Sequence, residues 1–400
     1  MRFEFGVKEA PKLEDISNGT RPQRSTKRPP TVMEVSTGLE VVAVKSWNVV
    51  TAIPILGALL RKLMSIFPDP EDQNIMSFIK VMWKYRAFDF RDFMQSHRLA
   101  LKKGQETGDF VPGVCNYYKV MADIITVSSG PFWHFVPMTH GLTRKQCHDQ
   151  FHHIMAKTLD AKKGEKILEF GCGFGEIGRQ VAKISGANVT GLTMADEEIE
   201  GGTERIAKAG LTGQCKMVQG NYHKMPFEGN SFDKIFGVYT LKYSADLDAA
   251  YGEFSRCLKK GGKLASYEIL ITDKYNPDDK QQKYHVDQIS ISTCMPSLWP
   301  AEAHRQAAKK AGLVLKEEVD LCKAPNTDPW YSCFEVTGVH RMLMSPMIYR
   351  LVKLGEAIRL LPRGFTDFYD SCLIHPATDF VIAGRAGIID GAVMMVFEKP

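Results

Sequence analysis

The sequence predicts an α/β protein built around a mostly parallel sheet. From residue 165 onward, short apolar runs alternate with segments of helical periodicity, which is the pattern of βαβ units. The first apolar run, 166–170, is followed at once by three glycines at alternate positions, Gly171, Gly173 and Gly175. A strand, a glycine turn and a helix in this order form a nucleotide-sized cradle at the carboxyl edge of a sheet.

The remaining elements follow the same alternation along the chain. Strands are expected at 188–192, 214–218, 233–238, 263–269, 313–319 and 392–398, and the helices between them at 176–185, 196–209, 245–258 and 301–311. A further helix is expected at 71–104, and an apolar insertion without a sheet assignment covers 325–390.

The glycine spacing separates two classes of ligand. G-x-G-x-G differs from the G-x-G-x-x-G fingerprint of dinucleotide sites, where a pyrophosphate lies on the helix N-terminus. S-adenosylmethionine (SAM) has no phosphate and needs only room for its amino-acid tail, so the spacing favours SAM. An NAD-dependent oxidoreductase is disfavoured, also because position 193 is Thr193 and not an acid.

The loops after the first strands supply the predicted cofactor residues. Glu169 precedes the turn by two residues and is expected to receive the SAM ammonium group. Thr193 occupies the place where an acid usually holds ribose hydroxyls, with Asp196 and Glu197 just behind it, and Asn221 can serve the adenine amine. The predicted set is Glu169, Gly171, Cys172, Gly173, Gly175, Thr193 and Asn221.

Composition and charge set outer bounds on the function. The chain has 400 residues, a net charge of +5 and nine cysteines without a C-x-x-C pair. A charge this small favours an anionic membrane surface weakly and does not call for nucleic acid. Widely spaced cysteines in odd number favour a reducing compartment and argue against a disulfide framework or a zinc site, so no metal is expected.

The chain is expected to divide into four parts. Residues 1–40 are interpreted as a disordered basic arm, and 41–110 as a helical segment that associates with a membrane. Within it, 41–63 is mostly apolar for about 15 residues, short of the roughly 20 that a spanning helix needs, and is interrupted by Pro54 and Gly57. A SAM-binding core at 111–324 and a C-terminal region at 325–400 with the last strand complete the chain.

Several motifs resemble one known family. GLTMADEEI at 191–199 is similar to class I SAM-dependent methyltransferases, and YEILITDKYNPDD at 267–279 resembles the sterol C-methyltransferase family more specifically. The stretch 328–331 and the tail 383–400 support the same resemblance, which covers roughly 115–400. It implies a class I SAM-methyltransferase, Rossmann-like, seven-stranded sheet with a helical N-terminal region and a C-terminal sterol-methyltransferase insertion or cap.

Departures from the family pattern concern the substrate side. Tyr243 stands where side-chain (C-24) sterol methyltransferases are expected to have histidine, and 124–135 lacks their leading Tyr-Glu and their Trp. These changes favour methylation of the nuclear C-4 position, as in nematode-type sterol 4-C-methyltransferases. C-24 methylation, a different lipid substrate and a non-catalytic sterol-binding protein stay open as alternatives, because GLTMADEEI also resembles cyclopropane-fatty-acid synthase relatives.

Carbon methylation needs an aligned carbon nucleophile, a dry site and a base. The candidates for the catalytic groups are Glu268, Tyr243 and His134, with His285 as a weaker one. The aromatic segment and a turn after the fifth core strand are expected to bind substrate through Phe132, Trp133, Phe135 and Asp273. A sterol substrate and a membrane surface are the expected partners, and a homo-oligomer stays open. The expected location is the cytoplasmic face of the endoplasmic reticulum or another lipid membrane, and otherwise the cytoplasm.

Overall fold

The structure is a computed structural model that describes residues 81, 83–129, 134–336 and 344–400. All of them belong to the unit formed by 62–400. The basic arm and the apolar segment 41–63 lie outside the described residues, so the predictions made for them stay predictions. No described helix is both long enough and apolar enough to cross a lipid bilayer.

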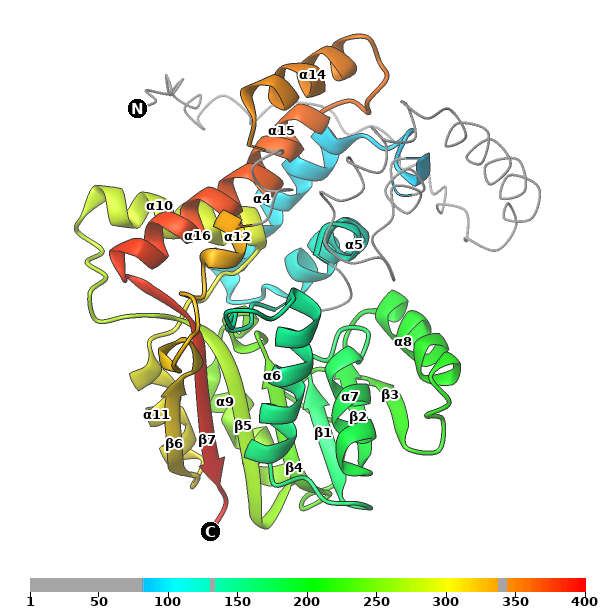
Figure 1. The fold of residues 1–400 in the computed structure, drawn as a ribbon, viewed down its shortest axis with the longest axis vertical. Coiled ribbons are helices and arrows are strands. Elements are labelled where there is room, and N and C mark those ends of the chain that lie inside the picture. Colours follow the sequence, from blue (N-terminus) through cyan, green and yellow to red (C-terminus); the bar gives the residue numbers. More distant parts are fainter. Residues whose placement is uncertain (1–80, 82, 130–133, 337–343) are drawn as a thin grey trace. The chain divides into compact units, whose positions relative to one another are not determined.

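A seven-stranded sheet organises the described chain, with the strand order β3-β2-β1-β4-β5-β7-β6 (Figure 1). Strands β1 to β5 run parallel, and β7 is antiparallel to both of its neighbours. The strands are β1 (Lys166–Phe170), β2 (Asn188–Thr193), β3 (Cys215–Gln219), β4 (Phe232–Val238), β5 (Leu258–Ile271), β6 (Val314–Asp320) and β7 (Ile389–Glu398). The predicted fold class is confirmed.

The central strands are buried on both faces, as expected for parallel strands covered by helices. In β1 only Lys166 is exposed, while the rest of the strand is buried, and Glu169 lies beside Gly191 of β2 and Phe236 of β4. Strand β5 begins earlier than predicted, because Leu258 already pairs with Phe232 before the register shifts.

Helices cover both faces of the sheet (Figure 1). On one face, α6 (Arg144–Thr158) and α7 (Glu176–Ser185) bury Met155 and Val181 in one apolar cluster. On the other face, α9 (Leu247–Cys257) and α11 (Ala301–Lys310) bury Phe254 and Ala307 in a second cluster. Helix α8 (Asp196–Lys208) follows β2 and contacts β3.

A layer of helices lies at the end of the sheet where the parallel strands finish (Figure 1). A third apolar cluster, which includes Phe90, Tyr117, Val352 and Phe368, holds much of this layer together. The layer comprises α4 (Phe90–Thr107), α5 (Val111–Ser129), α10 (Lys280–Thr293), α12 (Ser332–Val336), α14 (Pro346–Ala357), α15 (Phe365–Tyr369) and α16 (His375–Ala386). The described part of the apolar insertion at 325–390 therefore contributes four of these helices, α12, α14, α15 and α16.

The described part of the helix expected at 71–104 differs from the prediction. A turn at 85–87 precedes α4, which begins at Phe90 and ends at Thr107. Asp89 has extended backbone, and its carboxylate accepts hydrogen bonds from the Arg91 and Asp92 amides, which is an N-cap. A residue that caps the start of a helix cannot lie in the middle of one, and this explains the break.

Candidate active site

A pocket opens where β1, β2 and β4 end, beside α5. Its walls come from the glycine turn, the loops after β2, β3 and β4, and α5. This is the position expected for a ligand in an open parallel sheet. The polar and charged side chains that line it include those of His134, Glu169, Glu198, Asn221, Lys242 and Tyr243.

The glycine turn after β1 has a backbone that side chains would disfavour. Gly171, Gly173 and Gly175 have φ angles of 60°, 53° and 67°, in the left-handed region. A Cβ atom on Gly171 would lie 2.2 Å from Cγ2 of Thr240, so the β4 loop approaches the turn too closely for any other residue. Gly171, Cys172 and Gly173 all line the pocket, as predicted from the sequence.

Glu169 lies at the pocket wall, below this turn. One carboxyl oxygen, Oε2, accepts a hydrogen bond of 2.9 Å from the Gly178 amide in the first turns of α7. Burial raises the pKa of Glu169 to about 8, although the Gly178 hydrogen bond and Arg179 oppose the shift. A buried carboxyl group at this point fits the ammonium group of a bound amino acid, because a cation would favour its ionised form.

A second carboxyl group lines the pocket, and the sequence reasoning missed it. Glu198, in the first turn of α8, is buried and accepts a hydrogen bond from the Thr193 hydroxyl at the end of β2. Burial raises its pKa. The acid that position 193 lacks is therefore supplied by Glu198, whereas Asp196 accepts a hydrogen bond from Gln219 at 2.5 Å. The sequence feature that could have identified Glu198 is the run of three acids after β2, of which it is the third.

The loop after β3 brings Asn221 to the pocket, as predicted. Its side-chain oxygen accepts hydrogen bonds from the His223 amide at 2.9 Å and contacts His223 Nδ1 at 3.0 Å. His223 Nε2 in turn lies 2.8 Å from the Ser244 hydroxyl. These contacts link the loops after β3 and β4. They use the Asn221 oxygen that was expected to accept from the adenine amine, so the side-chain nitrogen, a donor, is the group of Asn221 that a ligand can meet.

Tyr243 and Lys242 occupy the short 3-10 helix Leu241–Tyr243 after β4. The hydroxyl of Tyr243 lies 2.5 Å from that of Tyr118 on α5, so this pair joins the sheet edge to the helical layer. The Lys242 ammonium lies 4.8 Å from the ring centre of Tyr239 and 5.1 Å from that of Tyr243. Tyr243 lines the pocket as predicted, and Lys242 is a residue that the sequence reasoning missed.

Lys242 is nearly completely buried, although no carboxylate lies within ion-pair distance of it among the described residues. Burial lowers the pKa of its ammonium group, and the negative charge of Glu268 opposes this shift. A buried lysine that faces two aromatic rings is well suited to meet a negative charge that appears in the pocket.

Glu268 lies behind the loop after β4 and does not line the pocket. Its Oε1 accepts hydrogen bonds from the Leu241 amide at 3.2 Å and from the Ser266 hydroxyl at 2.9 Å. Burial raises the pKa of this carboxyl group. In this position Glu268 holds the loop that carries Lys242 and Tyr243, and its predicted catalytic role stays a prediction.

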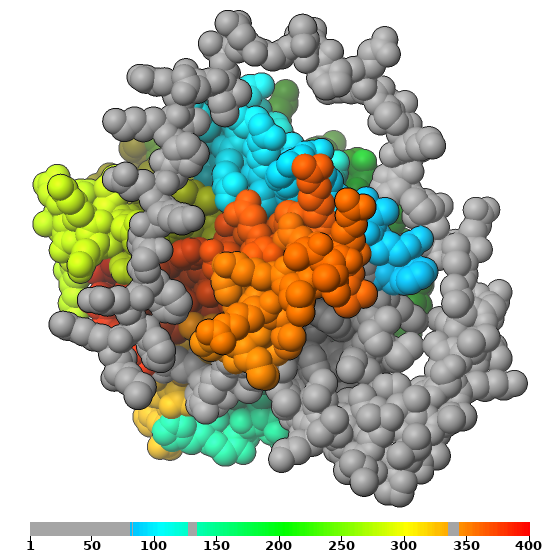
Figure 2. Space-filling model, turned by 90° about the horizontal axis from the view of Figure 1, so that it is seen from above, coloured from blue at the N-terminus to red at the C-terminus, as the bar shows by residue number. Residues whose placement is uncertain are grey.

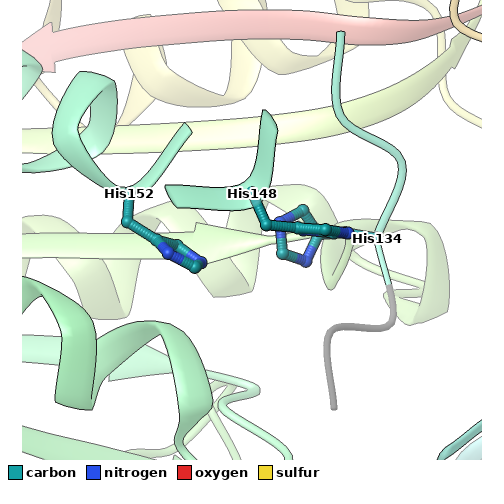
Figure 3. A group of neighbouring side chains, drawn as sticks. All are labelled: His134, His148 and His152. Atoms are coloured by element: carbon teal, nitrogen blue, oxygen red, sulfur yellow. The ribbon is translucent and has the colours of Figure 1, made fainter. Parts of the chain in front are cut away.

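His134 lines the pocket and belongs to a cluster of three buried imidazoles with His148 and His152 of α6 (Figure 3). Their nearest ring nitrogens lie within 4.8 Å of one another. A tetrahedral zinc ion brings its nitrogen ligands to about 3.3 Å from one another, so a spacing of up to 4.8 Å is wider than in a formed zinc site. Burial, His152 and Arg144 hold the pKa of His134 well below its usual range, so the ring is neutral. The cluster thus presents a neutral imidazole to the pocket.

The remaining predicted residues lie away from the pocket or outside the described residues. Phe135 packs in the core, with its ring 4.9 Å from Phe334 and 5.5 Å from Phe380. Asp273 is exposed in a turn, and His285 Nδ1 lies 2.8 Å from Asp379 on α16. Phe132 and Trp133 fall outside the described residues.

Comparisons with known proteins agree with this geometry. Residues 161–311 match a family model described as a methyltransferase domain. A geranyl diphosphate C-methyltransferase from Streptomyces coelicolor A3(2) shares the fold, with a TM-score of 0.56 and 16% identity over 72% of this chain and 96% of that chain. The sheet order and the glycine turn define a class I SAM-dependent methyltransferase.

Curated relatives narrow the class. A sterol 4-C-methyltransferase of Caenorhabditis elegans is 32% identical over 81% of this chain and 97% of its own length. 24-methylenesterol C-methyltransferase 3 of Arabidopsis thaliana is 31% identical over 75% of this chain and 81% of its length. The chain belongs to the sterol C-methyltransferase family, as its motifs predicted.

The pocket suits SAM in shape and in donor groups. The glycine turn leaves space for the amino-acid tail, Glu169 offers a carboxyl group to the ammonium, and Glu198 offers one to ribose hydroxyls. Asn221 lies on the far side of the β2 loop from the glycine turn and can receive adenine. The assignment of each side chain to a part of SAM stays a prediction.

Proposed function

We propose that this protein transfers a methyl group from SAM to C-4 of a sterol nucleus. The similarity to a nematode sterol 4-C-methyltransferase over nearly its whole length supports this choice. When bound, SAM supplies an electrophilic methyl group on a sulfonium sulfur. Glu169, Glu198 and Asn221 would hold it beside the glycine turn, in the pocket that the β4 loop also lines.

The assignment of the methyl group to C-4 rests on the buried Lys242 ammonium at the pocket. All sterols bear an oxygen on C-3, directly beside C-4, whereas C-24 lies in a hydrocarbon side chain far from any oxygen. With a 3-keto substrate, loss of a C-4 proton gives an enolate whose oxygen is negative. Lys242 then holds this oxygen, and its burial makes the interaction stronger than in water.

His134 is the proton acceptor in this scheme. The imidazole lies at the pocket wall, and burial keeps the ring neutral, so that it is available as a base although burial also makes it a weaker one. The C–H bond at C-4 breaks, its electron pair enters the enolate, and the proton passes to the His134 ring. C-4 then attacks the methyl carbon, the sulfonium sulfur keeps the electron pair of the broken bond, and the 3-keto group re-forms.

Methylation at C-24 is the competing function, since a cycloartenol C-24-methyltransferase of Oryza sativa is 30% identical to this chain and a sterol 24-C-methyltransferase of Neurospora crassa is 28% identical. An alkene carbon that attacks the methyl group becomes a carbocation. The ammonium of Lys242, between the rings of Tyr239 and Tyr243, would repel a cation formed beside those rings. The positive charge of Lys242 therefore favours an anionic intermediate beside the β4 loop.

The test is the position of the added methyl group. The purified protein is incubated with methyl-labelled SAM and with sterols that carry either a 3-keto or a 3-hydroxyl group, and the products are analysed by mass spectrometry and NMR. We expect label at C-4, and faster turnover of the 3-keto substrate. A methyl group found on the side chain would overturn the proposal.

The Lys242→Met variant tests the assigned role. We expect kcat to fall about 100-fold or more, as on removal of an oxyanion donor, while SAM binding by calorimetry stays within about twofold. Lys309→Met on α11, an exposed lysine far from the pocket, serves as the matched control and should keep full activity. An unchanged kcat in the Lys242→Met variant would remove this lysine from the mechanism.

A further inference from the structure

Helix α14 is apolar on two adjacent faces, which lie about 100° apart around its axis. Its inner face packs Ile348, Val352 and Gly355 against the rest of the helical layer. Its outer face leaves large apolar side chains in solvent: Met347 is 66% exposed, Leu351 54%, Leu354 55% and Ile358 63%. A surface helix of a soluble protein normally has a polar outer face, so this face requires an explanation.

The exposed side chains form one continuous stripe. Positions 347, 351, 354 and 358 are separated by four, three and four residues, which places them on the same side of a helix. Met344 before the helix and Leu360 after it are also exposed and extend the stripe at both ends. Figure 2 shows the α14 segment, in orange, at the front of one face of the molecule.

The charges beside the stripe are positive. Arg350, Lys353, Arg359 and Arg363 are all exposed, so 344–363 carries four basic residues. The acid of this segment, Glu356, points inward and accepts hydrogen bonds of 2.7 Å from the amides of both Gly364 and Thr366. The outward surface is thus apolar with a cationic border, because the one negative charge is used to hold the following turn.

We propose that the outer face of α14 docks on an anionic lipid membrane. An apolar stripe bordered by arginine and lysine is typical of helices that lie in the membrane interface, where the stripe enters the acyl region and the basic groups meet lipid phosphates. The helix lies along the surface. With 12 residues it is about 18 Å long, and a spanning helix must cross roughly 30 Å.

This docking face would deepen the proposed function, because a sterol is nearly insoluble in water. Val352 of α14 and Val114 of α5 belong to the same apolar cluster, and Val114 also lines the pocket. A membrane held against α14 is therefore separated from the pocket by packed apolar side chains of one helical layer. The geometry of the stripe does not depend on which carbon is methylated.

The test measures binding of the full chain to vesicles by co-sedimentation, without substrate. Vesicles of phosphatidylcholine with about one third phosphatidylserine are compared with pure phosphatidylcholine. The stripe variant carries Leu351→Gln, Leu354→Gln and Ile358→Gln. The control variant carries Leu142→Gln, Val314→Gln and Leu315→Gln, which are exposed apolar residues on other elements.

We expect the stripe variant to lose at least about tenfold in partitioning onto the anionic vesicles, with the control variant unchanged. Replacing Arg350, Lys353 and Arg359 by glutamine should weaken binding about fivefold per charge on anionic vesicles and hardly at all on neutral ones. Thermal unfolding and SAM binding of the stripe variant should match those of the wild type, which shows that the fold is intact.

Several results would overturn the proposal. Equal vesicle binding by the wild type and the stripe variant would place any lipid contact elsewhere, for example in 41–63. Wild-type protein that stays in the supernatant would exclude docking altogether. A dimer in light scattering that becomes a monomer in the stripe variant would assign this face to a second copy of the chain. Because vesicle binding needs no turnover, a failure of the C-4 assignment would leave these results unaffected.

Discussion

Replacing Gly171 by alanine tests how closely the loops around the SAM pocket pack. Gly171 has a φ angle of 60°, and a left-handed backbone is about 1–2 kcal/mol less favourable for alanine than for glycine. The new Cβ would also lie 2.2 Å from Cγ2 and 3.0 Å from Cβ of Thr240. Because this branch is fixed to the backbone, relieving the overlap moves the β4 loop, at about 1–3 kcal/mol.

We therefore expect Gly171→Ala to lower the free energy of unfolding by about 2–5 kcal/mol in urea titrations, and to weaken SAM binding. Gly175→Ala is the matched control, since Gly175 has a φ angle of 67° but its new Cβ would approach only flexible side chains, with the Met217 sulfur nearest at 3.1 Å. The Gly175→Ala variant should lower the free energy of unfolding only by the cost of the left-handed backbone, about 1–2 kcal/mol. Adding Thr240→Ala to Gly171→Ala should recover part of the loss. Equal urea midpoints for the two single glycine variants would refute the close approach.

Other consequences of the site can be measured separately. Glu198→Ala should weaken SAM binding in calorimetry by about 10–100-fold, and Glu198→Gln by only a few-fold, because glutamine keeps one acceptor. Glu169 has its pKa raised to about 8, so it is protonated in the free protein at neutral pH and ionises beside the SAM ammonium. SAM affinity should therefore rise from about pH 6 to 7.5 with release of a proton, and Glu169→Gln should abolish this rise. The same raised pKa means that the Glu169 contribution to the stability of the free protein is full below about pH 4.5 and is lost as the pH rises through about 8. Tyr118→Phe leaves the buried Tyr243 hydroxyl without its partner at 2.5 Å and should lower the free energy of unfolding by about 1–3 kcal/mol in urea. A flat pH profile, equal effects of the two Glu198 variants or an unchanged Tyr118→Phe midpoint would each contradict the contact concerned.

The sheet was accessible from sequence because its strands are local signals. The run 166–170 and the helix 176–185 match the structure to the residue, since a buried parallel strand is continuously apolar and the glycine turn marks its end. The helical layer was less accessible. Its apolar residues at 325–390 pack against α4 and α10, far away in sequence, and no local pattern specifies such partners.

The candidate site shows the same division between local and non-local information. Gly171 and Glu169 were predicted because a turn motif fixes their positions relative to a strand. Glu198 was missed because only the helical phase decides that the third acid after β2, and not Asp196, turns toward the pocket. Phe135 was expected to meet substrate, yet its segment places the ring among Phe334 and Phe380 in the core.

Lys242 and Glu268 together keep a positive charge buried beside the pocket. Both side chains are buried. Lys242 lies in the 3-10 helix after β4 and Glu268 within β5, and burial disfavours the charged form of each while the opposite charge of the other favours it. The Leu241 amide and the Ser266 hydroxyl both donate to Oε1 of Glu268, and Oε2 has no hydrogen-bond partner among the described residues. Glu268 acts on Lys242 through its charge, because neither carboxyl oxygen lies within ion-pair distance of the ammonium. An enolate oxygen would give Lys242 the close anion that it lacks among the described residues. An interaction that is weak with the ketone and strong with the enolate lowers the barrier, because only the difference between the two states accelerates the reaction.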